Sequence, residues 1–316
     1  MTNHDLEKLV DTSDEWITTR TGIKERHVLE DGVNASDCGV SAARAALEEA
    51  GVSPEEITHI FVATCTPDYL CPSTACLIAG KLGINASSGR MGGVMCLDFN
   101  AACTGFVYGL ELARDVLALH PDAVVLLVAA EALSRRTNFT DRTTCVLFGD
   151  AAGAVVVRGS DKGALWQIRD AVCSSDGSLH DLIKIGGGSA CHVKEGDTIG
   201  PDWFISMQGM AVFKHAVRSM TDESLGILER NGISLDELDL FIPHQANLRI
   251  IKAVGERLGI DEGKVFANVQ HYGNTSAATL PVAMEDARRA GALRPGMKVL
   301  LTSFGGGMTW GSVLLA

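Results

Sequence analysis

The sequence predicts an α/β protein built from two related halves, because an internal repeat and alternating helix and strand patterns run along its 316 residues. The segment GVSPEEITHIFVATCTP, from Gly51, recurs in outline as GISLDELDLFIPHQAN, from Gly232, at an offset of 181 (232 − 51). KLGI recurs as RLGI around Leu258, and VVLLVA recurs as KVLLTS from Lys298, at offsets of 176 and 174. Three ordered matches at a nearly constant offset indicate a structural repeat.

The first half begins with a helix that Asn34 can cap and that Gly51 ends, followed by the buried strand HIFVA. A second helix, over residues 73–82, precedes the strand MCLDF. A helix that starts near Cys103 and the strand AVVLLVAA complete the unit. Helices that alternate with near-continuous apolar strands favour parallel-rich sheets covered on both faces.

The glycine-rich and polar stretch 160–205, which includes GGGS, breaks this pattern and is predicted to connect the halves. We therefore expect an N-terminal half over residues 1–159, with a nucleophilic cysteine. Crossover loops and a C-terminal half, with a histidine and an asparagine, should occupy residues 160–316. No flexible Pro/Gly linker separates the halves, so one rigid unit is expected.

Composition and charge exclude several classes of protein. Twenty-seven Lys and Arg against 39 Asp and Glu give a net charge of −12, which disfavours binding to nucleic acid or anionic membranes. The longest apolar stretch, 123–130, is far shorter than the roughly 20 residues that span a bilayer, and the N-terminus is too polar for a signal peptide. Nine cysteines without a CxxC pair fit neither a disulfide framework nor a zinc ribbon. With no metal-ligand cluster, GxGxxG or P-loop, we expect a cytoplasmic enzyme without metal or cofactor.

Four segments could carry chemistry. Cys103 follows a predicted strand at a helix start, where backbone N–H groups and the helix dipole should lower the thiol pKa from about 8.5. His244 also follows a strand, and the repeat places Asn274 near the helix start opposite Cys103. Gly305 to Gly307 permit the close backbone approach that an oxyanion-binding turn requires. Taken singly, these residues also fit a buried thiol, a structural histidine, a helix cap and a tight turn.

Together, NAACTG around Cys103, PHQAN around His244, YGNTSAA around Asn274 and the terminal FGGGMTWGS resemble the β-ketoacyl-acyl-carrier-protein synthase III family. DTSDEWITTRTGI, from Asp11, is similar to that family's early segment. The resemblance covers nearly the whole chain and implies the thiolase fold, whose two pseudo-equivalent halves form α-β-α-β-α layers. A Cys-His-Asn set differs from the Cys-His-Cys of thiolases and the Cys-His-His of elongating condensing enzymes.

The resemblance implies a decarboxylating Claisen condensation that initiates fatty acid synthesis. Cys103 would accept the acyl group of an acyl-CoA primer, expected to be acetyl-CoA, and malonyl-acyl-carrier-protein would then lose CO₂. His244 and Asn274 would donate hydrogen bonds to the enolate oxygen. The amides of Cys103 and Gly306 would hold the oxyanion of acyl transfer.

The resemblance also implies binding residues and a homodimer. Residues similar to those that contact CoA are Trp16, Arg20, Arg142, Gly209 and Asn247. Since acyl carrier proteins are acidic, an enzyme of net charge −12 needs a local basic patch, expected at Lys214, Arg249, Lys252 and Arg257. Cys71 falls where a residue of the partner subunit shapes the acyl pocket in the family.

Two departures and several alternatives accompany this interpretation. Family members carry a strand and turn before the segment that opens this chain, so either the start is misassigned or the first sheet lacks a central strand. The stretch NASSGRMGGV, after Ile84, is longer than in the family.

The alternative functions are a condensing enzyme of secondary metabolism, an acyltransferase that does not decarboxylate, and a non-catalytic acyl-binding partner subunit. A metal-dependent hydrolase would need ligand clusters that the sequence lacks.

Overall fold

The computed structural model describes residues 1–85, 93–159, 163–189 and 200–316. Residues 86–92, which make up most of the NASSGRMGGV departure, lie outside the described residues, as does Cys191.

The first sheet has four strands in the order β2-β1-β3-β4. β1 is parallel to both β2 and β3, and β4 runs antiparallel to β3. Apolar side chains on both faces of the inner strands are buried, which explains the near-continuous hydrophobic runs in the sequence. The strands are β1 (His59–Ala63), β2 (Met95–Phe99), β3 (Val124–Glu131) and β4 (Ala151–Arg158).

The second sheet repeats this plan in the order β5-β10-β9-β8, with β8 parallel to β9 and the other neighbours antiparallel. A separate two-stranded sheet, β6-β7, belongs to the connecting region. The strands are β5 (Ile168–Ser175), β6 (Ile183–Ile185), β7 (Ile205–Met207), β8 (Leu240–Pro243), β9 (Val299–Gly305) and β10 (Thr309–Leu315).

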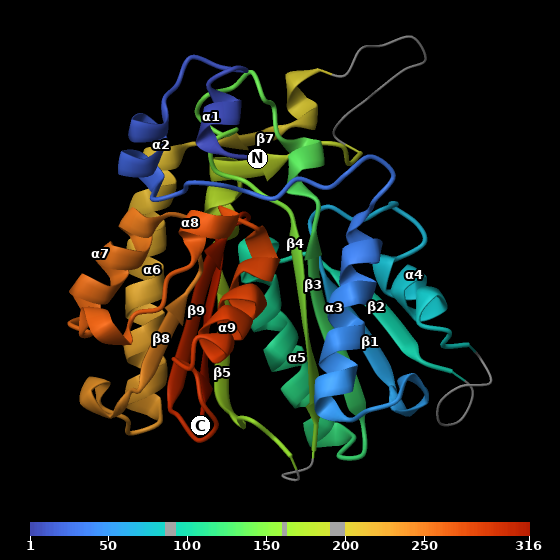
Figure 1. The fold of residues 1–316 in the computed structure, drawn as a ribbon. Coiled ribbons are helices and arrows are strands. Elements are labelled where there is room, and N and C mark those ends of the chain that lie inside the picture. Colours follow the sequence, from blue (N-terminus) through green and yellow to red (C-terminus); the bar gives the residue numbers. More distant parts are fainter. Residues whose placement is uncertain (86–92, 160–162, 190–199) are drawn as a thin grey trace.

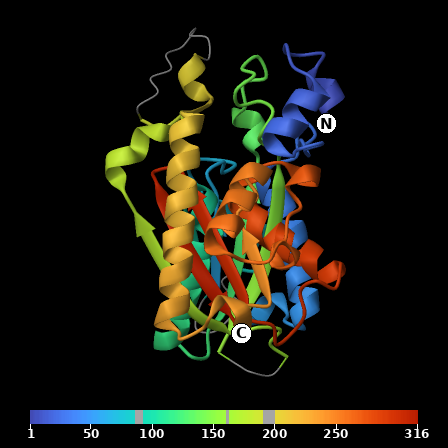
Figure 2. The same cartoon turned by 90° about the vertical axis from the view of Figure 1, so that its left-hand side faces the viewer.

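Helices form three layers around the two sheets. α5 and α9 lie between the sheets, α3 and α4 cover the outer face of the first, and α6 and α7 cover the outer face of the second (Figures 1 and 2). This is the expected α-β-α-β-α arrangement. Within the described ranges, no helix is both long and apolar enough to cross a membrane. The helices are α1 (Asn3–Leu6), α2 (Asp14–Thr21), α3 (Ala35–Ala50), α4 (Thr74–Lys81), α5 (Gly105–Leu119), α6 (Gly209–Arg230), α7 (Leu248–Leu258), α8 (Val269–Tyr272) and α9 (Thr279–Arg289).

Local signals set the helix ends as the sequence predicts. Asn34 is the N-cap of α3, where it forms a capping box with Asp37. Gly51 ends the same helix at φ 60°. Gly259 ends α7 at φ 75°, a left-handed conformation that costs glycine little.

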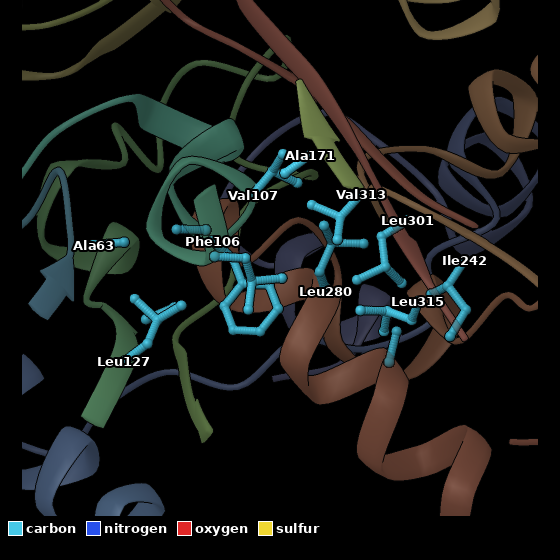
Figure 3. Close-up of a cluster of buried hydrophobic side chains, with 14 of the residues drawn as sticks. Ala63, Phe106, Val107, Leu127, Ala171, Ile242, Leu280, Leu301, Val313 and Leu315 are labelled. Atoms are coloured by element: carbon cyan, nitrogen blue, oxygen red, sulfur yellow. The ribbon is translucent and has the colours of Figure 1, made fainter. Parts of the chain in front are cut away.

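The central core joins the two halves. Phe106 and Val107 of α5 and Leu280 of α9 lie between Leu127 of the first sheet and Leu301 of the second (Figure 3). All five side chains are buried. Because this cluster draws on both sheets, neither half can bury its inner face without the other.

The repeat extends to the turns before the two central helices. Ala102–Thr104 precedes α5 and Ser276–Ala278 precedes α9, as single 3₁₀ turns at an offset of 174 (276 − 102). Ala102 and Ser276 share an unusual positive φ, 47° and 50°. Asn100 and Asn274 each accept a hydrogen bond from the backbone N–H two residues later, at 3.0 and 2.9 Å. The counterpart of Asn274 is therefore Asn100, one residue from the register expected from sequence.

One expectation about the first sheet is wrong. β4 and β10 are equivalent, because each runs antiparallel to the equivalent strands β3 and β9. The first strand of the second half is β5, and it lies at the sheet edge beside β10. Its counterpart in the first half would therefore be an edge strand beside β4 rather than a central one.

We predict that Gly105→Ala destabilises the protein by about 1 to 3 kcal/mol, because a Cβ there would lie 2.9 Å from Ala63 Cβ and 3.1 Å from Ala277 Cβ. Gly226→Ala is the matched control, since a Cβ at this position in α6 meets nothing within 4 Å. Its better helix propensity should stabilise the protein by about 0.5 to 1 kcal/mol. Urea unfolding measures both values, and equal stability of Gly105→Ala and wild type would contradict the close approach.

Candidate active site

Cys103 lies in the 3₁₀ turn that leads into α5, and the second half of the chain fixes this turn. The Ser303 hydroxyl, on β9, donates to the carbonyl oxygen of Cys103 at 2.8 Å. The Thr309 hydroxyl, on β10, donates to the carbonyl oxygen of Ala101 at 2.9 Å. The thiol is thus held at the junction of the two sheets.

The environment of the thiol differs from the sequence expectation. Burial raises the pKa of Cys103 to about 12. Hydrogen bonds from Ser276, from the backbone N–H of Cys103 and from Asn274 act in the opposite direction, while the charge of Glu131 raises the pKa further. The predicted lowering of this pKa at the helix start is wrong, because removal of water from the thiol outweighs the favourable donors. The resting side chain is a neutral thiol.

His244 follows β8 directly and is buried. Its backbone N–H donates to the carbonyl oxygen of Thr302 at 2.8 Å, and its ring Nδ1 lies 2.7 Å from the hydroxyl oxygen of Thr279, the first residue of α9. Burial lowers the pKa of His244 to about 3. The imidazole is therefore neutral at physiological pH, and the Thr279 hydroxyl fixes its orientation.

Asn274 faces Cys103 from the pseudo-equivalent turn. Its backbone N–H donates to the carbonyl oxygen of Leu147 at 2.8 Å, and its side-chain oxygen accepts from the Ser276 N–H. With the oxygen occupied in this way, the amide NH₂ is the group left to act as a donor, and Asn274 lowers the pKa of the Cys103 thiol. The two equivalent turns, which lie next to Cys103 and Asn274, contact each other at the centre of the molecule.

The terminal glycines pack against the turn that carries the thiol. A Cβ on Gly305 would lie 2.7 Å from the backbone nitrogen of Cys103, which only glycine permits. A Cβ on Gly306 would lie 3.6 Å from the Cβ of Ala102, and Gly307 takes a positive φ of 78°. The β9-β10 turn therefore lies beside the backbone amide of Cys103.

Sequence reasoning missed a buried carboxylate next to this centre. Glu131 ends β3, and its carboxylate accepts from the Thr66 hydroxyl at 2.7 Å and from the backbone N–H of Cys65 at 3.1 Å. Ser276 lies next to this cluster, with its Oγ 3.8 Å from the Cys65 sulfur. Burial raises the pKa of Glu131. The sequence feature that could have revealed this residue is a glutamate at the end of an eight-residue apolar strand, because α/β sheets place their functional sites at the carboxyl ends of parallel strands.

Three of the predicted CoA-contacting residues form one cluster. The guanidinium carbons of Arg142 and Arg20 lie 4.2 and 5.7 Å from the centre of the Trp16 ring. Asn247, the N-cap of α7, donates from Nδ2 to the carbonyl oxygen of Arg20 at 3.2 Å. Gly209 is the first residue of α6. Four of the five residues are therefore linked by contacts.

The four predicted docking residues are exposed on α6 and α7: Lys214, Arg249, Lys252 and Arg257. Arg249 lies 5.7 Å above the Phe213 ring, so the two helices present a shared surface. Lys252 pairs with Glu262 at 3.5 Å, which reduces its share of the positive charge.

Cys71 lies apart from these residues. It is exposed and lines a depression of about 410 Å³ together with Tyr69, Leu97 and Phe99. For metals, no group of three or more His, Cys, Asp or Glu side chains among the described residues is arranged to hold an ion.

Comparisons with known proteins agree with this geometry. Family models described as 3-oxoacyl-[acyl-carrier-protein (ACP)] synthase III and its C-terminal part match residues 97–177 and 228–316. A beta-ketoacyl-[acyl-carrier-protein] synthase III of Nitratidesulfovibrio vulgaris (strain DSM 19637 / Miyazaki F) is 58% identical over 315 residues, which cover 100% of this chain and 93% of that protein. One of Desulfitobacterium hafniense (strain Y51) is 43% identical, with coverage of 100% and 93%. The crystal structure of 3-oxoacyl-[acyl-carrier-protein] synthase III from Aquifex aeolicus VF5 has a TM-score of 0.89 at 44% identity, with coverage of 100% and 94%.

Five layers, two of them equivalent sheets, with a cysteine at the start of a central helix define an acyltransferase of the thiolase fold. The sequence identities to synthase III relatives extend over the whole chain, and they narrow the assignment from this fold to one family. The chain belongs to the β-ketoacyl-acyl-carrier-protein synthase III family.

Because the folded pKa of His244 is about 3 and the ordinary value is 6.5, only the unfolded chain binds a proton at this residue between those values. The stability due to the neutral ring is complete above pH 6.5 and is lost as the pH falls toward 3. We predict that acidification from pH 7 to 4.5 lowers the unfolding free energy of wild type by about 2 to 3 kcal/mol more than that of His244→Gln. Urea unfolding at both pH values measures the difference, and equal losses would indicate an ordinary pKa.

Proposed function

We propose that this chain condenses an acyl-CoA primer with malonyl-acyl-carrier-protein to give 3-oxoacyl-acyl-carrier-protein, CO₂ and CoA, as the initiating step of fatty acid synthesis. The observation that carries the proposal is the buried Cys103 turn, which Ser303 and Thr309 of the second half fix at the junction of the two halves, beside the equivalent turn that follows Asn274. We take residues 1–159 to supply the nucleophile, and residues 160–316 to supply His244 and Asn274. Acetyl-CoA is the primer we expect.

In the first stage, the Cys103 sulfur attacks the thioester carbonyl of the acyl-CoA. The S–H bond breaks as the new S–C bond forms, because a thiol of pKa about 12 is protonated at rest. Negative charge then develops on the carbonyl oxygen. We assign its stabilisation to the backbone amides of Cys103 and Gly306, whose removal in comparable sites costs about 10²–10³ in rate. The bond from the acyl carbon to the CoA sulfur then breaks, and CoA leaves as a thiol that carries the proton lost by Cys103.

In the second stage, malonyl-acyl-carrier-protein loses CO₂, and the enolate oxygen needs hydrogen-bond donors. We assign these to Nε2–H of His244 and Nδ2–H of Asn274. A neutral imidazole can donate from Nε2 only if Nδ1 accepts, and the Thr279 hydroxyl, 2.7 Å from Nδ1, is placed to donate there. A neutral donor stabilises the enolate without protonating it, so the carbanion stays available to attack the Cys103 thioester.

The substrate carriers are assigned to two surfaces. We propose that Trp16 and Arg142 flank the CoA adenine, because an indole and a guanidinium both stack on a flat, charged nucleotide. At 4.2 Å the two groups now contact each other, so they must move apart to take the adenine between them. Arg20 would lie near the phosphates, and Asn247 and Gly209 would line the pantetheine channel. The acidic carrier protein would dock on the exposed cations of α6 and α7.

A homodimer and a cytoplasmic location complete the proposal. β2 is an edge strand, and its Met95 and Leu97 side chains are 54% and 39% exposed, beside Tyr69 and Leu70 at 58% and 87%. An apolar strand edge of this kind favours pairing with a second copy, which would bring Cys71 toward the partner's acyl pocket. The eight cysteines within the described residues are free thiols, which suits a reducing compartment.

Secondary metabolism is the second candidate. The priming beta-ketosynthase of the R1128 polyketide biosynthetic pathway has a TM-score of 0.87 at 33% identity. Since identities to the beta-ketoacyl-acyl-carrier-protein synthase III relatives reach 56–58%, the fatty acid role is favoured.

We predict that Cys103→Ala abolishes acyl transfer from acyl-CoA but retains CO₂ release from malonyl-acyl-carrier-protein, because His244 and Asn274 remain in place. Acyl adducts measured by mass spectrometry and CO₂ release separate the two stages. Condensation by the Ala variant at the wild-type rate would refute the mechanism. Absence of an adduct on wild-type Cys103 would favour the non-catalytic partner subunit.

We also predict that Arg249→Glu raises KM for malonyl-acyl-carrier-protein about tenfold while KM for acyl-CoA changes little, because the reversed charge repels the acidic carrier. Arg44→Glu, on the exposed face of α3 in the first half, is the matched control and should leave both constants near wild type. Steady-state kinetics at low ionic strength measure the effect. Unchanged carrier-protein kinetics in Arg249→Glu would remove α7 from the docking surface.

A further inference from the structure

Gln245 is a buried side chain next to His244 that the mechanism above leaves without a role. Only 1% of it is exposed. Its Nε2 donates to the carbonyl oxygens of Pro243 at 2.7 Å and Phe266 at 3.2 Å, and its Oε1 accepts from the N–H of Asn268 at 2.9 Å. The side-chain amide thus uses both its donor and its acceptor group on the backbone. It joins two stretches of chain that lie up to 23 residues apart in the sequence.

The first stretch carries His244. The peptide unit between Pro243 and His244 is held on both sides: its carbonyl oxygen accepts from Gln245, and its N–H donates to the carbonyl oxygen of Thr302 at 2.8 Å. Because a peptide unit is planar, hydrogen bonds at its two opposite edges fix the orientation of the whole unit. Gln245 therefore helps to set the direction in which the His244 side chain leaves the backbone.

The second stretch leads to Asn274. Asn268 is the N-cap of α8, which is a single turn of four residues, and Asn274 is the second residue after this turn. Asp286 of α9 holds both ends of the turn, since its carboxylate accepts from Asn268 Nδ2 at 2.9 Å and from the Tyr272 hydroxyl at 3.2 Å. The bond from the Asn268 N–H to Gln245 thus connects the path to Asn274 with the end of β8.

The two stretches meet again on the other side of the site. The Asn274 side-chain oxygen accepts from the N–H of Ser276 at 2.9 Å. Three residues further on, the Thr279 hydroxyl oxygen lies 2.7 Å from His244 Nδ1. Hydrogen bonds and short segments of chain therefore form a closed path from His244 through Gln245 to Asn274 and back. Removal of the Gln245 amide would open this path.

We propose that Gln245 is a positioning residue that sets the spacing between His244 and Asn274, the two donors to the enolate oxygen. The inference rests on the proposed function, because it concerns the stage in which malonyl-acyl-carrier-protein loses CO₂. Both donors must reach one oxygen atom at hydrogen-bond distance, so a shift of about 1 Å in either donor weakens its bond. Three buried hydrogen bonds from one planar amide oppose that shift.

The nucleophile is held by other groups. Ser303 and Thr309 fix the turn that carries Cys103, and none of the three bonds of Gln245 goes to these residues. Gln245 should therefore affect the loss of CO₂ and leave acyl transfer unchanged. A residue that served only the stability of the fold would affect both stages alike.

Gln245→Met tests the proposal, because it removes all three hydrogen bonds and keeps a side chain of similar length. CO₂ release from malonyl-acyl-carrier-protein should slow by about 10- to 100-fold. Acylation of Cys103 by acyl-CoA, followed by rapid-quench mass spectrometry, should stay near the wild-type rate. Gln270→Met is the matched control in the same stretch, since its amide makes one longer bond, of 3.4 Å, to the carbonyl oxygen of Ala267. It should leave both stages near wild type.

Two further variants sharpen the test. Gln245→Asn keeps an amide but is one methylene shorter, so it cannot reach both stretches. It should show the same difference between the stages, and it decides the question if Gln245→Met does not fold. Gln245→Met combined with His244→Ala should release CO₂ as fast as His244→Ala alone, because the spacing matters only while both donors are present. Thermal unfolding confirms that each variant is folded.

The outcomes separate the positioning role from the overall function. If the Gln245 variants release CO₂ as fast as wild type, or slow both stages by the same factor, the positioning role is wrong while the condensing function stands. A double variant much slower than His244→Ala would also overturn it, since Gln245 would then act independently of His244. If the wild-type protein takes up no acyl group on Cys103 or releases no CO₂ from malonyl-acyl-carrier-protein, the proposed function itself fails.

Discussion

The active site depends on hydrogen bonds from the second sheet to the turn before α5. Hydrogen bonds from Ser303 and Thr309 to the carbonyls of Cys103 and Ala101 join the nucleophile of one half to strands of the other. Gly305 allows this approach, because any side chain there would strike the Cys103 amide. The amide stays beside the β9-β10 turn only while both halves are packed together, so the shared core around α5 and α9 is also what assembles the site.

Burial then decides the protonation of the assembled groups. The same loss of water raises the pKa of Cys103 to about 12 and lowers that of His244 to about 3. A resting thiolate–imidazolium pair is therefore disfavoured, and the cluster holds a neutral thiol and a neutral imidazole. Any proton that leaves the thiol must move as the sulfur attacks.

The repeat shows how two equivalent turns have come to differ. Both use an asparagine to hold the residue of positive φ, so Asn100 and Asn274 keep the same backbone task. The side chains around them differ between the halves. Cys103 of the first half is equivalent to Ala277 of the second, and Ala102 is equivalent to Ser276. A structural element present in two copies can thus give its side chains separate tasks, because the hydrogen bonds of the asparagine maintain each turn on its own.

Periodicity, capping and local motifs in the sequence predict the two-half α/β plan, the helix ends at Asn34 and Gly51, and the family. The motifs also pointed to Cys103, His244 and Asn274. Only the folded chain shows the thiol pKa, the His244–Thr279 contact, the edge position of β5 and the cluster around Glu131. Each of these joins residues distant in the chain. A pKa depends on how much water the surrounding fold removes and on which donors it brings close, and no local pattern records either quantity.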